Sequence, residues 1–578
     1  MKYPVLPAGK SHRSTVTVFK GLNKTPRIGA GELADMENLT SDAYPVLSPR
    51  KRRGILETEG KASGLIAKDA LCRVEGRDFV MNGVRVDLGL TEGEKQLVSM
   101  GAYVIILPDK VWVNTLDLNR HGSMEAVFST DTDVVFTLST VTGEDMGEPV
   151  ASDREPEDPE TGTLWLDTGH NVLYEYTGDG GWTGLSGVYV KLSAPGIGRA
   201  FSCYDGVTLS GIRLPELAQL NGAAVIRDRG EDHIVIPGLI SRQRIQLASE
   251  GAVKVERWVP EMDYVVEAGN RLWGCRYGIS RDGEPVNEIY ASKLGDFKNW
   301  NCFMGVSTDS WRASVGTDGV FTGAVTHLGY PVFFKENCLH KVYISDSGAH
   351  ALRQTGCRGV QSGCAGSLAV VGELLFYKSR DGVCVYDGSL PEDISRPLGE
   401  LPCIRGAGGA GGSKYYLSLQ APDGGWQLLV YDTVRRLWHR EDALGVLAFC
   451  PCRGELYALE AETGRILALL GSHTPEPEPV AWMAETGDLG ITEPESGYLY
   501  RLQLQLFLAL GAQVRISARY DDDSHWTPLC SLRGTGLKRF LVPIRPRRCS
   551  RLRLRLEGEG QGMLYAIIRT GQKGSERL

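Results

Sequence analysis

The sequence predicts an all-β protein, namely a β-propeller with an inserted small β module and a C-terminal β-sandwich. Three observations support this class. A phrase made of a glycine turn and an aromatic strand recurs through the middle of the chain. Glycine makes up 71 of 578 residues, well above the usual ~7%, as many tight turns require. From residue 480 onward apolar and polar side chains alternate with the period of a strand.

The recurring phrase lies between Gly269 and Glu460. Its later copies return about every 40 residues, which is the length of one four-stranded propeller blade. One blade cannot bury both of its faces, so blades stack around an axis and cover one another. An ordinary antiparallel sandwich also alternates strands with turns, but it gives no reason for one phrase to recur. The copies are residues 269–273, 329–333, 372–377, 412–416 and 454–457.

These patterns divide the chain into five parts. Residues 1–55 form an N-terminal arm, and residues 56–118 supply the first propeller strands. The period breaks over residues 119–255, where we expect an inserted β module that contains an acidic, proline-rich linker at 148–159. Residues 256–470 carry the main blades, and residues 480–578 form the sandwich after a stiff linker.

The composition argues against several classes of function. A net charge of −8 does not favour wholesale electrostatic binding of nucleic acid. The N-terminus lacks the apolar core of a signal peptide, and no stretch of roughly 18 apolar residues could span a membrane. The 13 cysteines are scattered without zinc-ligand spacing, so we expect free thiols made in a reducing cytosol. The basic run Arg50–Arg53 is more typical of a solvated face or a subunit contact than of a nucleic-acid site.

Two phrases carry a resemblance to a known family. The first runs through the arm as F-x-G-L-N at 19–23, G-E-x-x-D-x-x-N-L at 31–39 and Y-P-x-L-x-x-R at 44–50. It resembles the opening of propeller-type tail proteins of tailed bacteriophages, which include tail nozzle or tail-tubular proteins and DNA-stabilising head–tail adaptors. The second phrase, E-I-Y-A-S-K-L-G-D-F-K-N-W at 288–300, is similar to one common in such virion proteins.

The resemblance implies a structural virion protein. Subunits of that family form a ring, commonly six-fold (a hexamer), at the tail or the head–tail connector, and genomic DNA passes through its lumen during ejection. This implies a homo-oligomer whose partners are other tail or adaptor proteins. It would be made in the host cytoplasm and located in the virion tail, with the arm clasping a neighbour. A mildly acidic chain suits a conduit, because a negative wall repels phosphate.

The inserted module contains an aromatic set that supports a second hypothesis. Its phrase G-x-L-W-x-D-T … L-Y-x-Y … W resembles small β modules of phage tail and fibre proteins. Rings at strand spacing are more typical of a miniature core. Exposed rings can instead stack on sugars, which would make the protein a receptor- or glycan-binding tail-tip protein. The residues are Trp165, Tyr174, Tyr176 and Trp182.

The C-terminal strands place arginines opposite a leucine face. Alternation over 551–556 predicts that Leu552, Leu554 and Leu556 are core and that the arginines between them point outward. Such a basic face is either solvated or a docking surface for an acidic neighbour. Its residues are Arg545, Arg547, Arg548, Arg551, Arg553 and Arg555.

We find no contiguous motif for catalysis. Ser280-Arg-Asp-Gly283 starts like the Asp box of sialidase-type propellers but lacks the later glycine and tryptophan, and reads as a turn. The glycines of 406–412 lack the Lys-Ser/Thr of a phosphate loop. The acidic run 521–525 lacks the spacing of a calcium loop. We therefore expect no enzyme activity, no cofactor and no metal, and a glycan-degrading propeller enzyme is the least favoured alternative.

Overall fold

A computed structural model describes residues 11–573 except 131, 248–252, 475–479, 490–496 and 546–547. The described chain is almost entirely β, with 3-10 turns at Pro215–Leu220 (η1), Ala365–Ser367 (η2) and Arg396–Leu398 (η3). Within the described residues, no helix has the length and apolar character needed to cross a bilayer.

Seven four-stranded antiparallel sheets of described residues form a propeller, which confirms the predicted fold class. The first two blades are β6–β9 (Ala62–Lys68, Ala70–Glu75, Asp78–Met81, Val84–Asp87) and β10–β13 (Gln96–Met100, Tyr103–Leu107, Val111–Asn114, His121–Ser123). The next two are β27–β30 (Tyr264–Ala268, Arg271–Ile279, Pro285–Ala291, Trp311–Ser314) and β31–β34 (Gly323–His327, Tyr330–Lys335, Cys338–Tyr343, Ala351–Gly356). Then follow β35–β38 (Ala369–Val371, Leu374–Ser379, Gly382–Tyr386, Glu392–Asp393) and β39–β42 (Arg405–Gly411, Lys414–Gln420, Trp426–Asp432, Leu437–Arg440).

The seventh blade closes the ring because its fourth strand comes from the N-terminal side of the first blade. Strands β43 (Val446–Cys452), β44 (Glu455–Glu460) and β45 (Ile466–Ala468) are completed by β5 (Gly54–Leu56), which precedes the first blade. The first strands of successive blades contact one another around the ring, with η2 bridging β31 and β39, and β43 contacts β6. The chain therefore joins its two propeller ends within one sheet.

The aromatic strands of the recurring phrase are the second strands of their blades. Trp273 and Phe333 are fully buried. Phe376 of the fifth blade stacks on Tyr415 of the sixth with ring centroids 5.1 Å apart. The phrase recurs because each blade covers its neighbour with these rings.

Two five-stranded sheets form the sandwich, and the arm supplies a strand to each. One sheet has the order β1 (Ser11–Val16), β53 (Gly562–Lys573), β47 (Gly497–Leu508), β50 (Gly536–Val542), with β51 (Arg548–Cys549) also on β47. The other has the order β2 (Leu33–Glu37), β46 (Ala481–Thr486), β52 (Leu552–Glu559), β48 (Gln513–Tyr520), β49 (Thr527–Arg533). Leu552, Leu554 and Leu556 are buried as predicted. A further pair, β3 (Leu39–Thr40) and β4 (Ser48–Pro49), lies within the arm.

The insertion leaves the propeller after the second blade and returns before the third. Its entry and exit strands, β14 (Ala126–Thr130) and β26 (Val253–Arg257), pair with each other in a sheet of order β14-β26-β21-β22, with β21 at Gly206–Ser210 and β22 at Gly222–Val225. A second sheet contains β23 (Asp228–Arg229), β24 (His233–Pro237), β20 (Tyr189–Ser193), β15 (Val134–Ser139) and β25 (Arg244–Leu247). A third contains β16 (Val150–Ser152), β17 (Leu164–Asp167), β18 (Val172–Tyr176) and β19 (Trp182–Gly184).

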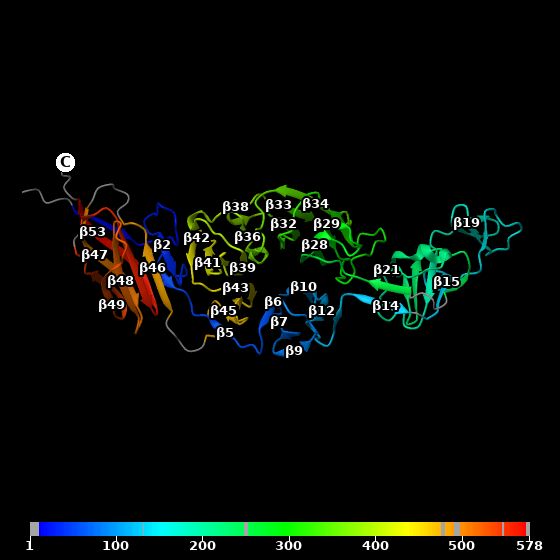
Figure 1. The fold of residues 1–578 in the computed structure, drawn as a ribbon, viewed down its shortest axis with the longest axis horizontal. Coiled ribbons are helices and arrows are strands. Elements are labelled where there is room, and N and C mark those ends of the chain that lie inside the picture. Colours follow the sequence, from blue (N-terminus) through cyan, green and yellow to red (C-terminus); the bar gives the residue numbers. More distant parts are fainter. Residues whose placement is uncertain are drawn as a thin grey trace, which may run out of the picture.

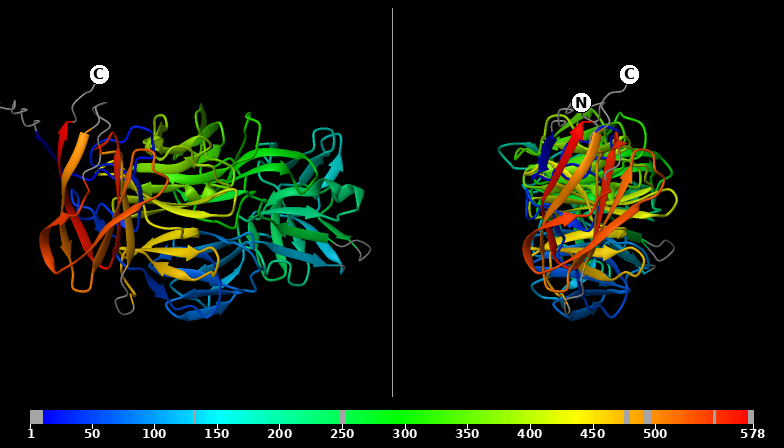
Figure 2. Two further views of the ribbon diagram at one scale, coloured as in Figure 1. Left: turned by 60° about the vertical axis from the view of Figure 1, so that its left-hand side comes forward. Right: turned by 90° about the vertical axis from the view of Figure 1, so that its left-hand side faces the viewer.

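The insertion begins later than residue 119, because His121–Ser123 is a short polar strand without apolar alternation that still belongs to the second blade. The three parts lie in a row, with the sandwich and the insertion at opposite ends of the propeller (Figure 1). Viewed from the sandwich end, the sandwich strands lie in front of the propeller (Figure 2, right). The molecule is therefore elongated.

Candidate functional site

The first resembling phrase forms the joint between the sandwich and the propeller. Leu22 N–H donates to Trp438 O of the sixth blade at 2.7 Å. Gly21 has φ +80, and a Cβ there would lie 2.2 Å from the same oxygen, so the close approach requires glycine. Asn38 donates from Nδ2 to Ala481 O at 2.9 Å, and its Oδ1 accepts from Arg50 Nε at 2.7 Å. The residues of this phrase therefore hold the arm against both the sixth blade and the sandwich.

The basic run belongs to this joint. Arg53 binds Glu441 and Asp442 at 2.7 Å each, and Arg50 binds Asp442 at 3.3 Å. Burial opposes ionisation of Asp442, but Arg53 and Arg50 outweigh it and hold the pKa of this carboxyl below its ordinary value. The expectation of a solvated face or a subunit contact is therefore wrong for these two arginines, because their acidic partners lie on the sixth blade and are distant in sequence.

The second phrase forms part of the opposite joint. Asn299 Nδ2 donates to Tyr204 O at 2.7 Å, and its Oδ1 accepts from Gly206 N–H at 3.0 Å, which fixes the insertion to the third blade. A buried ion pair between Arg257 and Asp205 lies in the same region. Arg257 also donates from Nε to Met124 O at 3.2 Å. The insertion is thus held by buried polar contacts in addition to its two connecting strands.

A groove with a volume of about 630 Å³ opens at this joint, between the insertion and the third blade. We call it the junction groove. Its wall combines aromatic rings with carboxylates and arginines, the mixture that can bind a polar ligand such as a sugar. These groups come from β26, β28, β29 and β30 and from the loops beside them. They are Trp258, Tyr290, Trp300, Glu125, Glu256, Glu261, Glu284, Glu288, Arg276, Arg281 and Arg312.

Several charged groups of the groove are already paired. Arg281 binds Glu256 at 3.0 Å, and Arg276 binds Asp263 at 2.8 Å. Burial and the adjacent Glu288 raise the pKa of Tyr290, so this phenol stays protonated and can donate a hydrogen bond. No group of three or more His, Cys, Asp or Glu side chains in the described residues could hold a metal ion.

The groove was missed by sequence reasoning. Its residues are spread from position 110 to position 312 and meet only in the folded chain. The one available signal was the phrase at 288–300, which contributes Glu288, Tyr290 and Trp300, but we interpreted it only as a family resemblance. The turn Ser280–Gly283 lies at the rim and is a turn as expected, since Ser280 Oγ accepts from Asp282 N–H at 3.3 Å.

The predicted aromatic set of the insertion is brought together on β17, β18 and β19. Trp165 stacks on Tyr174 at 5.1 Å and meets Trp182 edge-on at 5.4 Å. Tyr176 packs on Trp182 at 5.3 Å. Trp165 is buried, whereas the other three rings are half-buried. The set is a cluster with a partly open surface, and glycan binding by it stays a prediction.

The predicted arginine face is largely engaged within the sandwich. Arg553 and Arg555 both bind Glu485, at 3.5 and 3.0 Å. The Arg555 guanidinium also lies 4.5 Å from the Trp526 ring centroid. Arg551 binds Asp522 at 2.7 Å, and Arg545 is exposed. Arg547 and the side chain of Arg548 lie outside the described residues, and docking by this face stays a prediction.

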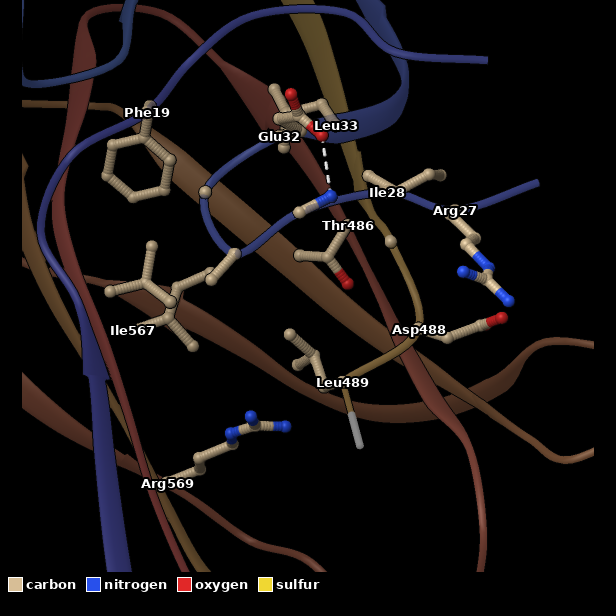
Figure 3. Close-up of a pocket in the computed structure, with 15 residues that line it drawn as sticks. Phe19, Arg27, Ile28, Glu32, Leu33, Thr486, Asp488, Leu489, Ile567 and Arg569 are labelled. Carbon is tan, nitrogen blue, oxygen red and sulfur yellow. Dashed lines mark hydrogen bonds between the residues drawn. The ribbon is translucent and has the colours of Figure 1, made fainter. Parts of the chain in front are cut away.

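A second pocket, of about 500 Å³, lies where the arm crosses the sandwich (Figure 3). Phe19, Ile28, Leu489 and Ile567 contribute apolar walls. Arg569 donates from Nε to Ser14 Oγ at 2.9 Å, and burial lowers the pKa of Arg569. The arm turn keeps its shape because the Glu32 carboxylate accepts from Gly29 N–H, drawn as a dashed line in Figure 3.

No family model and no curated protein matches the sequence. Among solved structures, U3-55K is similar over 73% of this chain and 98% of its own, at 6% identity and a TM-score of 0.28. An exo-β-1,3-galactanase from Phanerochaete chrysosporium is similar over 53% of this chain and 94% of its own (8% identity, TM-score 0.18). A family 43 arabinoxylan arabinofuranohydrolase from Bacillus subtilis covers 55% and 96% (9% identity, TM-score 0.17).

Two of these neighbours are glycoside hydrolases, which contradicts the expectation that the chain is not an enzyme. That expectation rested on the absence of contiguous catalytic motifs. The absence of such motifs does not exclude a site built from distant residues, since carboxylates and arginines from distant parts of the sequence converge in the junction groove. The TM-scores are too low for the likeness to say anything about a substrate.

Proposed function

We propose that this chain is a structural subunit of a tailed-bacteriophage virion that assembles into a ring in the tail or head–tail conduit. The observation that carries the proposal is the placement of the two resembling phrases. One phrase joins the sandwich to the sixth blade and the other joins the insertion to the third blade. The residues that carry the resemblance to virion proteins therefore lie where they fix the relative positions of three domains.

An unpaired sheet edge supports assembly. Strand β50 pairs only with β47 among the described residues, which leaves its other side open. It exposes Leu537 and Leu541, at 49% and 62% of their surface. An open edge with exposed leucines can pair with another chain, and the exposed Lys538 and Arg539 of the same strand restrict which chain fits there. A neighbouring subunit at β50 would cover this edge.

The test is the mass of the purified full chain in solution, with negative-stain images of the same sample. We expect rings, or a monomer that forms rings when its tail neighbours are added. Leu537→Lys together with Leu541→Lys should abolish the rings and leave the fold intact by circular dichroism. The matched control is Leu510→Lys, an exposed leucine in the turn after β47. A wild-type protein that remains monomeric within assembled particles would overturn the proposal.

A second candidate is a glycan-binding tail-tip protein, favoured by the open junction groove and the aromatic cluster. Saturable binding of host polysaccharide that is lost on Trp258→Ala would place binding in the groove. Loss on Trp182→Ala would place it in the aromatic cluster. Release of reducing sugar in the same assay, lost on Glu288→Gln, would indicate hydrolysis by groove residues.

A further inference from the structure

We propose that Cys364 and Cys403 form a modification site, a dithiol that closes to a disulfide between the fifth and sixth blades. Their Sγ atoms lie 3.6 Å apart in a buried setting. Cys364 directly precedes η2, before the first strand of the fifth blade, and Cys403 lies two residues before the first strand of the sixth. The bond would therefore tie two neighbouring blades at their inner ends.

Two glycines allow the loops to lie this close. Gly363 has φ +80, and a Cβ there would meet Ile404 O at 2.2 Å. A Cβ at Gly406 would lie 3.2 Å from the Cys364 sulfur. The backbone joins the loops as well, because Gly406 N–H donates to Gly363 O at 3.3 Å. The sequence on both sides thus permits the sulfur contact.

A buried lysine faces the pair. Lys378 is fully buried, and its ammonium donates to Gln361 Oε1 at 2.8 Å and to Ser379 O at 2.6 Å. No carboxylate of the described residues lies within 4.0 Å of it. A buried ammonium needs a counter-charge. The Cys403 thiol donates to Gln361 Oε1 at 3.5 Å, the same oxygen that accepts from the Lys378 ammonium, so loss of the thiol proton would place a thiolate beside the positive charge.

The two thiols are therefore unequal. A hydrogen bond from Cys364 and the charge of Lys378 outweigh burial and lower the pKa of Cys403 to about 7. The same hydrogen bond, together with burial, raises the pKa of Cys364. Tyr415 also interacts with Cys364, and burial raises the pKa of its phenol, which stays protonated. One sulfur is thus the nucleophile and the other the proton donor.

The reaction with an azo oxidant such as diamide proceeds in two steps. The Cys403 thiolate adds to one nitrogen of the N=N bond, and the other nitrogen takes a proton from water. The Cys364 sulfur then attacks the Cys403 sulfur and breaks its bond to nitrogen. The departing nitrogen takes the proton of the Cys364 thiol. One S–S bond forms, and the two electrons taken from the thiols reduce the azo group to a hydrazine.

The experiment uses the folded full chain. It is treated with diamide, its remaining thiols are alkylated, and it is digested without reduction for mass spectrometry. We expect a peptide pair linked through Cys364 and Cys403 that dithiothreitol separates. Cys403→Ser should abolish the link, whereas Cys384→Ser, a change at another buried thiol of the fifth blade, should keep it. If diamide has reacted completely with the exposed Cys203 and the linked pair of Cys364 and Cys403 is still absent, the proposal is overturned.

The pH profile of the linking rate tests the role of Lys378. With the native lysine we expect a half-maximal rate near pH 7, and Lys378→Met should move it upward by at least one pH unit. If that variant does not fold, the native profile decides. A native midpoint at the ordinary thiol value of about 8.5 would overturn the thiolate–ammonium pair.

Discussion

The ion pair between Arg257 and Asp205 is buried on both sides, with 6% and 2% of the side chains exposed. Removing one partner of such a pair leaves an uncompensated charge in a low-dielectric region. We expect Asp205→Asn to lower the free energy of unfolding by about 3–5 kcal/mol, measured by urea denaturation.

The control for this substitution is Arg281→Gln at the rim of the junction groove. Arg281 pairs with Glu256 but is largely exposed, so solvent screens the interaction. We expect a loss below about 1 kcal/mol. Equal losses for the two variants would show that the Arg257–Asp205 pair is not desolvated in solution.

His439 gives the stability a dependence on pH. It is fully buried, and burial lowers its pKa from 6.5 to about 3. Between those values the unfolded chain binds a proton that the folded chain excludes. Stability is therefore complete above about pH 6.5 and falls as the pH decreases toward 3, by at most about 1.4 kcal/mol per pH unit. His439→Phe should flatten this slope in urea titrations between pH 7 and pH 4.

His340 offers a comparison for the same titration. Burial lowers its pKa to about 4, so its contribution is lost over a narrower range, from about pH 6.5 to about pH 4. His340→Phe should therefore flatten the slope less than His439→Phe does. An unchanged slope in both variants would show that neither imidazole causes the loss of stability between pH 7 and pH 4. Asp442, whose pKa is lowered, acts in the same direction but mainly below that range.

At the scale of elements, the pairing of the closing strand β5 with the seventh blade depends on Arg53, the residue that precedes it. Arg53 is buried between Glu441 and Asp442 of the sixth blade, so it anchors the chain where β5 joins the seventh. Arg53→Met should cost about 3 kcal/mol, because it removes the closest cation of the Glu441 and Asp442 carboxylates and leaves them only Arg50. Hydrogen exchange should accelerate first in β5 and β45.

The neighbouring Lys51 serves as the matched control. It is exposed, and Lys51→Met should change stability by no more than about 0.5 kcal/mol. A variant at Arg53 that loosened all blades equally would indicate that the ring opens as one cooperative unit, and that β5 is not its weakest point.

The blades were predictable because their signal is local. A glycine turn, an aromatic strand and a second strand follow one another within each repeat, so their spacing is visible in the sequence. The closing strand β5 and the arm strands β1 and β2 were not predicted as parts of sheets. Each pairs with a strand several hundred positions away, such as β1 with β53, and no local pattern encodes that pairing.

The functional residues show the same limit. The sequence placed Trp165, Tyr174 and Trp182 on adjacent strands, and they do meet. It could not show that Arg553 and Arg555 face Glu485, because that carboxylate comes from another strand. The junction groove was invisible for the same reason, although its tyrosine and tryptophan lie in a phrase that the sequence marked.

The whole molecule is a chain of three bodies in which the insertion is attached at one place. Ala126 and Arg257 are directly opposed partners of the antiparallel pair β14 and β26. Such partners have Cα atoms roughly 5 Å apart, a span that a two-residue hairpin turn closes. Residues 127–256 can therefore be replaced by Asn-Gly, together with Arg257→Ser because the excision removes Asp205. We expect a cooperative unfolding transition that includes the propeller and the sandwich.

The excised protein also separates the possible assembly surfaces. If subunits meet at β50, the exposed edge lies in the sandwich at the opposite end of the molecule from the deletion (Figure 1). Rings should then form with the same symmetry but a shorter dimension in negative-stain images, and polysaccharide binding through the junction groove or the aromatic cluster should be lost. A folded excised protein that forms no rings would move the subunit contact from the sandwich edge to the insertion.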